Sequence, residues 1–439
     1  MIKLKQNLQS IVQENIVLVF YGIALVSMCI FLQVPSPVIN YIRYFYCLFI
    51  FAVVLFRKKK ISINKVALFI VGCFLLHTLL FGFIFIPSSL HSGVIDNGKE
   101  MLMFWVFAFF TAQYVYETKK TKEFLLITYF VLSFFIDIVY FTHFNGIAPI
   151  KFLPNIFGIG DTVRVRFDFG FVSNNAAAYM CLMVFIFTVI VWREYLSNNH
   201  VFTRAWSIPK IYMFISGTIT VLMMLSTQTR AALMLALGFW LVSKYFSNYA
   251  NKRRKKSFTA FFLLIVVCIV AFYGYFVYTD GDSRSVYLTW NVSVFLQYGN
   301  LLTGLGYEPF SAFLNDSYGL MTAPMDNYYL YILCSTGYLG LILIIIPILF
   351  ILFYFIYAYF QKRTSKLQAQ FIILFIVVIM MGFTESNIVY SFSPYSVLCW
   401  TCFLLVIMGI KKDKKQLQSY SVCYKHYEDR GVGIIEESK

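Results

Sequence analysis

The sequence predicts an all-α integral membrane protein with about twelve transmembrane helices. Hydrophobic residues make up 60% of its 439 residues and charged residues only 13%, whereas a soluble domain has roughly 25% charged residues. Apolar stretches close to the ~20 residues needed to cross a bilayer recur along the whole chain. The basic residues between these stretches gather on alternate connections. Together, the three observations predict a polytopic bundle, and the positions of its basic residues predict its orientation across the membrane.

The apolar stretches define the expected spans in chain order. Segment 327–359 is too long for one plain span and contains Gly337 and Gly340, so a tilt, a kink or a short re-entrant stretch before Gly337 is expected. Gly304 and Gly306, in the preceding loop, are expected to allow a turn with positive φ. The expected spans are 16–34, 39–56, 66–86, 101–116, 124–141, 171–192, 211–226, 231–246, 258–278, 327–359, 367–383 and 391–410.

The distribution of lysine and arginine sets the expected orientation. Most of the 36 basic residues fall in the N-terminal segment, in five connections and in the C-terminal tail, with the densest run at 251–257. Because basic residues accumulate in cytoplasmic segments of membrane proteins, both termini are expected in the cytoplasm. The net charge of +16 therefore reflects topology, and no nucleic-acid partner is expected. The basic residues on the opposite, outward side are Arg43, Lys99, Lys151, Arg164, Arg166, Arg230 and Arg284.

The chain is expected to form a single polytopic membrane domain, 1–410, followed by a polar and disordered cytoplasmic tail, 411–439. The first apolar stretch has no cleavage site after it, so it is expected to be a retained span. Two connections are long, 142–170 and 279–326, and both face outward. Long loops in compact proteins are usually functional or disordered, and these two are expected to fold over the outward mouth as the cap of an active site.

Neither a metal nor a cofactor is expected. The nine cysteines are scattered and show no CxxC or Cys/His spacing. His77 lies in the middle of a span and is interpreted as a core histidine. His91 and His143 face outward without a partner at metal-ligand spacing.

Arginines on the outward side break the charge rule, and this is the first indication of a site. A guanidinium is always charged, and its planar fork suits phosphate and carboxylate groups. Arg230 lies in a very tight turn beside serine, threonine and glutamine, which favours a functional role. For Arg164 and Arg166, phosphate binding and pairing with a nearby acid are both open. Arg43 and Arg284 are interpreted as residues that snorkel to the interface.

Polar residues at the outward ends of spans supply further candidates. Asn174 and Asn175 open a helix rich in small residues, where they either cap the helix or contact a sugar. Asp326 and Asn327 precede the tenth span and look like a second N-cap pair. Asp326 can also take a proton from a sugar hydroxyl, with Glu308 and Asp316 as rival bases.

Four outward motifs together resemble those of one protein family, and their order and spacing carry the resemblance. They are Phe171–Ala178 (FVSNNAAA), Ser226–Ala232 (STQTRAA), Gly304–Gly306 (GLG) and Asp326–Gly340 (DNYYLYILCSTGYLG). Over roughly 165–345, and in its twelve-span architecture, the chain resembles the O-antigen ligase and Wzy-type polymerase superfamily of bacterial polysaccharide assembly.

The resemblance implies a GT-C-like polytopic glycosyltransferase in the bacterial cytoplasmic (inner) membrane. Its substrate would be undecaprenyl-pyrophosphate-linked oligosaccharide at the outer face, and a flippase and a chain-length regulator would be partners. Arg230 matches the family's turn arginine, and Arg164 or Arg166 would match the arginine before the small-residue helix. The ligase branch has a histidine where this chain has Asp326, which favours a polymerase of O-antigen, capsule or exopolysaccharide.

The expected reaction joins repeat units without a metal ion. A hydroxyl of the next lipid-linked unit attacks the anomeric carbon, while Arg230 and the two loop arginines stabilise the departing pyrophosphate. Asp326 or Glu308 orients or deprotonates that hydroxyl, and Asn175 and Asn327 are candidates for binding the substrate.

Two alternatives stay open. One is an O-antigen ligase, which passes the glycan to lipid A core. The other is a lipid-linked oligosaccharide flippase or a secondary transporter. A transporter is expected to carry several ionisable residues near mid-membrane, whereas here the polar clusters lie in the outward loops.

Overall fold

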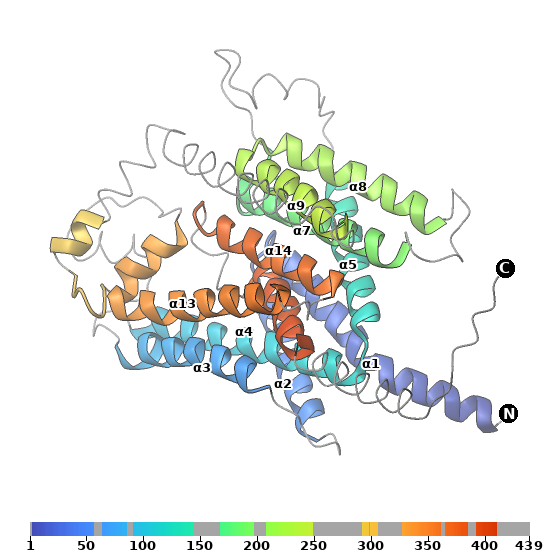
Figure 1. Ribbon diagram of the computed structural model, residues 1–439, viewed down its shortest axis with the longest axis horizontal. Helices are drawn as coiled ribbons and strands as arrows, with labels where there is room; N and C mark the ends of the chain where they lie inside the picture. Colours follow the sequence, from blue (N-terminus) through green and yellow to red (C-terminus); the bar gives the residue numbers. More distant parts are fainter. Residues whose placement is uncertain are drawn as a thin grey trace, which may run out of the picture.

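The computed structural model shows a bundle of helices (Figure 1). Among the residues that it describes, regular structure is helical, apart from an isolated antiparallel bridge between Asn300 and Gly304. The predicted all-α class is therefore confirmed for this part of the chain. Six of the helices are long and apolar enough to cross a membrane. The structure describes residues 2–56, 64–85, 91–143, 167–196, 208–248, 292–297, 299–305, 327–360, 365–384 and 392–410.

Most helices follow the expected spans within a few residues, whereas α1 begins 14 residues and α4 begins 10 residues before the expected span. A short helix covers 292–297, and the last described helix is Pro394–Ile410. Helices α3 and α7 each continue into a short π-helical turn, η1 and η3. The labelled helices are α1 (Ile2–Phe31), α2 (Pro37–Leu55), α3 (Lys65–Leu79), η1 (Leu80–Ile84), α4 (His91–Thr118), α5 (Thr121–Thr142), α7 (Asn174–Val191), η3 (Trp192–Leu196), α8 (Ile208–Ser226), α9 (Arg230–Asn248), α13 (Tyr328–Phe360) and α14 (Lys366–Met381).

Each expected span except the ninth contains a described helix. The ninth, 258–278, lies outside the described residues, and so do the tail 411–439 and most of the two long loops, 142–170 and 279–326. The total of twelve spans therefore stays a prediction.

Local sequence signals explain where several helices begin. Pro37 occupies the first turn of α2, where its missing N–H leaves no helical hydrogen bond unmade. Asn64 caps α3 by accepting a hydrogen bond from the Val66 N–H at 2.9 Å. Ser365 and Gln368 form a reciprocal capping box at the start of α14. These polar caps pair backbone groups that an apolar environment would otherwise leave unsatisfied.

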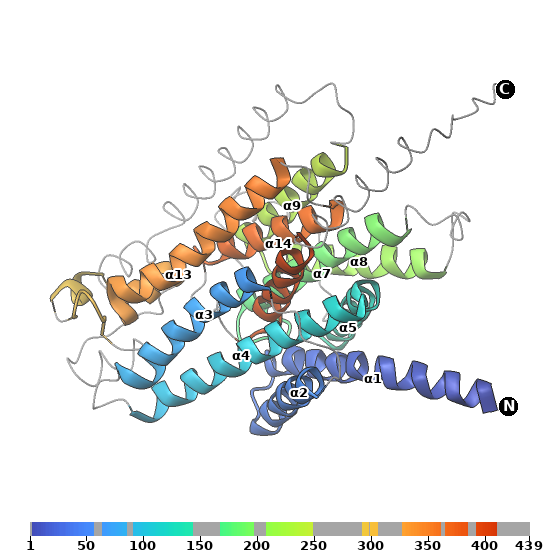
Figure 2. The same ribbon diagram turned by 60° about the horizontal axis from the view of Figure 1, so that its bottom comes forward.

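The described helices extend between two ends of the bundle (Figure 2). One end, which we call the basic end, carries side-chain contacts between helices. One contact joins α1 to the start of α5, and the others join α5, α9 and α14 to η3. These contacts are Lys120 Nζ to Asn15 Oδ1 (2.8 Å), Lys122 Nζ over the Tyr195 ring (5.7 Å), Arg193 Nη1 to Ser243 Oγ (2.5 Å) and Gln370 Nε2 to Glu194 Oε1 (3.2 Å). The opposite end, which we call the polar end, carries residues 167–175, 226–230 and 382–384.

The helix Pro394–Ile410 forms the centre of the bundle (Figure 2). Nearly all of its residues are buried, as expected for a helix that is apolar on every side. The Trp400 ring lies 4.8 Å from the Phe74 ring, 5.0 Å from the Trp105 ring and 5.2 Å from the Phe375 ring, measured between centroids. These contacts join the central helix to α3, α4 and α14, so aromatic residues build the interior as well as the lipid-facing surface.

Helix α13 is broken at Gly337, so of the arrangements that its length left open a kink is present. Gly337 has φ 65° and ψ −169°, which interrupts the helical hydrogen bonds. Segment 299–305 replaces them. The Leu305 N–H donates to the Cys334 carbonyl at 2.9 Å, and the Leu301 carbonyl accepts from the Tyr338 N–H at 2.9 Å. The break is therefore a paired junction between two segments of the chain.

Gly304 completes this junction. Its φ of 78° confirms the positive φ predicted at this position, whereas Gly306 lies outside the described residues, and an antiparallel bridge joins Gly304 to Asn300. A side chain at Gly304 would overlap with the Ser335 carbonyl, and one at Gly337 would overlap with the Leu302 carbonyl. Both positions therefore require glycine for space as well as for backbone conformation.

We predict that Gly337→Ala lowers the stability of the protein. Adopting a positive φ costs an alanine about 1–2 kcal/mol, and the overlap with the Leu302 carbonyl adds to this. The midpoint of thermal unfolding in detergent measures the effect. Gly72→Ala in α3 is the matched control, because a Cβ there meets no atom within 4 Å. Equal midpoints for the two variants would contradict the geometry of the junction.

Candidate functional site

The turn between α8 and α9 is polar and buried. Ser226, Thr227, Gln228 and Thr229 all have buried side chains. Gln228 has φ 51°, an uncommon conformation for a residue other than glycine. Arg230 is the first residue of α9 and is half-buried. The tight turn predicted from the sequence is confirmed, and it places a guanidinium at a helix N-terminus.

Hydroxyl groups hold the turn in place. The Ser226 hydroxyl donates to the Leu222 carbonyl at 2.8 Å, and the Thr227 hydroxyl donates to the Met224 carbonyl at 2.7 Å. The bond from Thr227 pairs one of the last four carbonyls of α8, which have no partner within the helix. The polar residues beside Arg230 thus have a structural task, which does not compete with a role for the arginine.

Asn175 lies against this turn. Its Oδ1 accepts a hydrogen bond from the Thr229 hydroxyl at 3.3 Å. The N-cap of α7 is Ser173, whose Oγ accepts the Ala176 N–H at 3.1 Å, so the predicted capping role of Asn174 and Asn175 is wrong. The serine, in an extended backbone conformation just before the helix, reaches the N–H group of the third helical residue. Asn175 therefore sits inside the first turn of α7, where it faces α9.

Segment 167–172 connects the turn to α1. The Phe167 N–H donates to the Ser226 carbonyl at 3.4 Å, and the Val172 N–H donates to the Leu32 carbonyl at 3.1 Å. Asp168 shapes the segment by accepting the Gly170 N–H at 3.0 Å. Arg164 and Arg166, which precede this segment in the sequence, lie outside the described residues.

Asn327 caps α13, as the sequence predicted. Its Oδ1 accepts the Leu330 N–H at 3.1 Å. The adjacent Tyr328 N–H donates to the Gly382 carbonyl at 2.7 Å, which places the start of α13 beside the end of α14. Tyr328 itself is fully buried. Asp326 and Glu308, the two predicted bases, lie outside the described residues.

A contact that the sequence did not reveal joins these elements. The Tyr179 hydroxyl lies 2.5 Å from the Thr384 hydroxyl. Tyr179 stands one turn of α7 after Asn175, and Thr384 follows α14. The polar run that begins at Thr384, directly after an apolar span, marks Thr384 in the sequence but does not indicate its partner.

The contacts form a continuous chain across the polar end. They run from Asn327 and Tyr328 through the end of α14 to Tyr179, and from there along α7 to Asn175 and the start of α9. The structure thus brings Arg230, Asn175 and Asn327 to one end of the bundle. The N-termini of α7 and α9 meet there, and each carries a partial positive charge. Such an arrangement favours the binding of an anion.

Arg43 corrects one interpretation of the sequence. It is 1% exposed and does not snorkel to an interface. Its Nη1 donates to the Phe392 carbonyl at 3.1 Å, and its Nη2 lies 3.7 Å from Oε1 of Glu100. The guanidinium also lies over the rings of Phe31 and Phe392, at 4.1 and 4.8 Å from their centroids. Carbonyl, carboxylate and aromatic partners within the protein replace the water that a snorkelling arginine would seek.

In the part of the chain that the structure describes, no group of three or more His, Cys, Asp or Glu side chains is placed to hold a metal ion. His77 is fully buried, with its ring centroid 5.0 Å from that of Phe81, which confirms the interpretation as a core histidine.

The chain matches no protein-family model and no curated protein sequence.

We predict that Asn175 and Thr229 are energetically coupled. A double-mutant cycle with Asn175→Ala and Thr229→Val measures the interaction through the unfolding free energy. A hydrogen bond between neutral side chains contributes about 0.5–1.5 kcal/mol, so a coupling energy in that range is expected. Pairing Asn175→Ala with Thr218→Val, whose hydroxyl bonds within α8 at 2.8 Å to Phe214, gives the control cycle. If the effects on the unfolding free energy were additive in both cycles, the start of α7 and the α8–α9 turn would not be joined by this hydrogen bond.

We also predict that Arg43→Met destabilises the protein although it keeps much of the side-chain volume. The substitution leaves the buried Phe392 carbonyl without its donor, and an unsatisfied buried polar group costs about 1–3 kcal/mol. Thermal unfolding in detergent tests this, with exposed Lys65→Met as the control. If Arg43 were a snorkelling arginine, Arg43→Met and Lys65→Met would unfold at the same temperature.

Proposed function

We propose that this protein is a membrane glycosyltransferase that joins undecaprenyl-pyrophosphate-linked oligosaccharide repeat units into a polysaccharide. The product would be an O-antigen, a capsule or an exopolysaccharide, made at the outer face of the bacterial cytoplasmic membrane. The observation that carries the proposal is the position of Arg230, which begins α9 and lies beside the N-terminus of α7 at the polar end.

The charge distribution supports this placement. Apart from Arg43, the basic side chains that tie the described helices together lie at the other end of the bundle, as expected if that end faces the cytoplasm. Arg230 is then outward, at a depth where a lipid-linked pyrophosphate would lie. A guanidinium with two helix N-termini suits the two phosphate groups of such a substrate.

The remaining topology belongs to the same proposal. A polytopic domain of twelve spans over 1–410, with both termini in the cytoplasm, would place the loops 142–170 and 279–326 above the polar end. Arg164 and Arg166 precede Phe167, whose N–H bonds to the Ser226 carbonyl in the turn of Arg230. This sequence neighbourhood supports a joint role for the three arginines.

The proposed reaction forms one bond and breaks one. An oxygen of a sugar hydroxyl on the incoming repeat unit bonds to the anomeric carbon of the growing chain. The bond between that carbon and the pyrophosphate oxygen breaks, and its electron pair leaves with the pyrophosphate. Arg230 stabilises this developing negative charge. The hydroxyl proton passes to a carboxylate, for which Asp326 and Glu308 are the candidates from the sequence.

Asn175 and Asn327 have supporting roles in this proposal. Asn175 fixes the first turn of α7 against α9 through Thr229, and Asn327 caps α13 beside the end of α14. Both residues therefore hold the polar end in shape. Their amide groups retain the capacity to bind a sugar hydroxyl when substrate is present.

We predict that Arg230→Ala abolishes polymer formation. In a deletion strain complemented with wild type or variant, the glycan length distribution is measured on the lipid carrier and at the cell surface. Loss of one charge-stabilising group lowers turnover by roughly 100-fold, so single repeat units should replace polymer. Arg230→Lys keeps the charge without the planar fork and should restore only part of the polymer.

Lys244→Ala is the matched control, because Lys244 is a basic residue of α9 at the opposite, basic end. It should leave chain length unchanged. Polymer of normal length retained on the lipid carrier in the deletion strain would instead identify a ligase. Absence of all outward-facing repeat units would identify a flippase. Normal polymer in the Arg230→Ala strain would refute the role of the arginine.

A further inference from the structure

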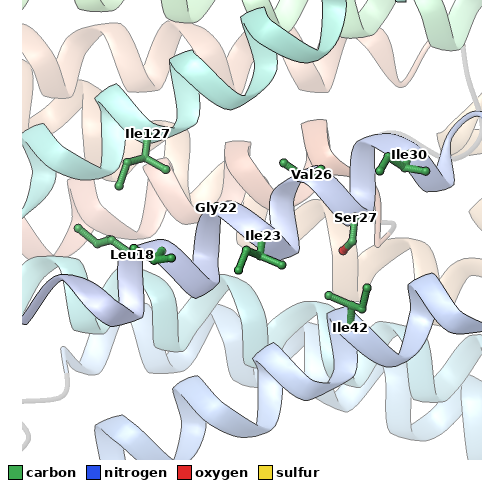
Figure 3. A pocket seen from close by; sticks show the side chains of 9 residues that line it. Leu18, Gly22, Ile23, Val26, Ser27, Ile30, Ile42 and Ile127 are labelled. Atoms are coloured by element: carbon green, nitrogen blue, oxygen red, sulfur yellow. The ribbon is translucent and has the colours of Figure 1, made fainter. Parts of the chain in front are cut away.

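Hydroxyl groups inside the apolar helices commonly bond to a carbonyl three or four residues earlier in the same helix. Figure 3 shows Ser27 among the aliphatic side chains that line a recess on α1, and its hydroxyl donates to the Ala24 carbonyl at 2.7 Å. The Thr128 hydroxyl of α5 donates in the same way to the Phe124 carbonyl at 2.8 Å. Such bonds satisfy a hydroxyl within its own helix, so these residues require no ligand.

Four residues between α5 and α8 depart from this pattern. Asp137 of α5 faces Ser216 and Tyr212 of α8, and Tyr129 of α5 also faces Ser216. Asp137 Oδ1 and the hydroxyl oxygens of Ser216 and Tyr129 are buried, and none has a hydrogen-bond partner among the described residues. Ser216 is 0% exposed and Tyr129 is 1% exposed. Unpaired oxygens at such burial call for a polar ligand. We call these four residues the α5–α8 cluster.

The Tyr212 hydroxyl presents its lone pairs, and not its proton, to Asp137. The Ser133 hydroxyl donates to the Phe130 carbonyl at 3.3 Å and lies 3.0 Å from the Tyr212 hydroxyl. Because Ser133 has a single proton, Tyr212 is the donor between the two hydroxyls. The Tyr212 oxygen therefore faces the Asp137 carboxyl as an acceptor. Two acceptors face each other across the cluster, and a positive charge is needed between them.

Asp137 has no basic partner in the part of the chain that the structure describes. It is half-buried, and its neighbours Phe134 and Ile138 are 62% and 45% exposed on the surface of α5. Both α5 and α8 are long and apolar enough to cross a membrane. Along the axis of α5, Asp137 lies roughly 8 Å from Thr142, where the helix ends. A lone carboxylate within an apolar span is costly, so its charge has to be neutralised locally.

We propose that the α5–α8 cluster binds a small monovalent cation such as Na⁺. Hard cations prefer oxygen ligands, and the cluster offers a carboxylate together with the hydroxyl oxygens of Tyr129, Tyr212 and Ser216. One negative charge balances one positive charge, whereas a divalent cation would leave a net charge in apolar surroundings. Such a site does not need the group of His, Cys, Asp or Glu side chains that a divalent metal requires.

The site does not rest on the proposed function, because it uses none of the residues proposed for catalysis. Arg230 begins α9, whereas the cluster lies near the middle of α8 and toward the C-terminal end of α5. Helix α8 leads directly into the turn that carries Arg230. A cation between α5 and α8 would therefore hold in place the helix from which that turn starts.

Thermal unfolding and direct binding of radioactive Na⁺ test the proposal. Purified protein in detergent is compared in sodium chloride and in N-methyl-D-glucamine chloride at equal ionic strength. The organic cation is too large to fit between the hydroxyl groups. We expect saturable binding of Na⁺ and a higher unfolding midpoint in sodium chloride, because a ligand that binds only the folded state stabilises it.

Two variants and two matched controls locate the ion. Asp137→Asn removes the charge with little change in volume and should weaken Na⁺ binding about 100-fold. Ser216→Ala removes one oxygen ligand and should weaken it about tenfold. Glu123→Gln removes an exposed carboxylate of the same helix, and Thr218→Ala removes a hydroxyl that bonds within α8 to the Phe214 carbonyl. Both controls should bind Na⁺ as wild type does.

Ser216→Ala also guards against a loss of folding in Asp137→Asn. It removes a buried hydroxyl that bonds to no described group, so the variant should fold. Its midpoint should rise less with Na⁺ than that of wild type, and the midpoint of Asp137→Asn should not respond to Na⁺ at all.

Equal midpoints of wild type in the two salts, without saturable Na⁺ binding, would overturn the proposal. If the midpoint of wild type then fell with rising pH while that of Asp137→Asn did not, a proton alone would neutralise Asp137. Saturable Na⁺ binding that neither Asp137→Asn nor Ser216→Ala weakens would place the ion elsewhere in the protein and would overturn the proposal as well.

Discussion

The need to pair every backbone polar group in apolar surroundings governs this structure. The clearest case is the break in α13, where Gly337 frees carbonyl and N–H groups in the middle of a long apolar helix. Segment 299–305 supplies the missing partners through the Leu305 N–H and the Leu301 carbonyl. An isolated break would leave several groups unpaired, at a few kcal/mol each. The kinked helix and the segment before it therefore depend on each other.

The same requirement organises the polar end. Four consecutive polar residues, Ser226 to Thr229, are buried between α8 and α9, and they can be buried there because hydroxyl groups bond to carbonyls of the adjoining helix turn. Thr229 then bonds across to Asn175, and Tyr179 contacts Thr384. Because the polar groups at these helix ends find hydrogen-bond partners in one another, the helix ends lie side by side. A polar, positively polarised surface results at one end of an otherwise apolar bundle.

The sequence predicted the parts of this structure that follow from one-dimensional patterns. Apolar length located the helices, and the overlong span with Gly337 and Gly340 indicated an irregularity, of which the structure shows a break at Gly337. It did not predict that Ser173 rather than Asn175 caps α7, because both residue types suit that position and only the backbone conformation separates them. The contact between Tyr179 and Thr384 was also missed. It joins residues 205 positions apart, and no local pattern encodes such a pair.

Arg43 and Arg230 show why an exception to the charge rule does not by itself identify a site. Both lie toward the polar end and both are exceptions to the charge rule, and the sequence separates them only by the tight polar turn beside Arg230. Arg43 is enclosed by a carbonyl, a carboxylate and two aromatic rings, all from helices of its own bundle, so its charge is used in holding α1, α2, α4 and the segment before the central helix together. Arg230 is half-buried, begins a helix and stands beside a second helix N-terminus. Burial thus separates an arginine that the fold needs from one whose charge is placed to meet an anionic substrate.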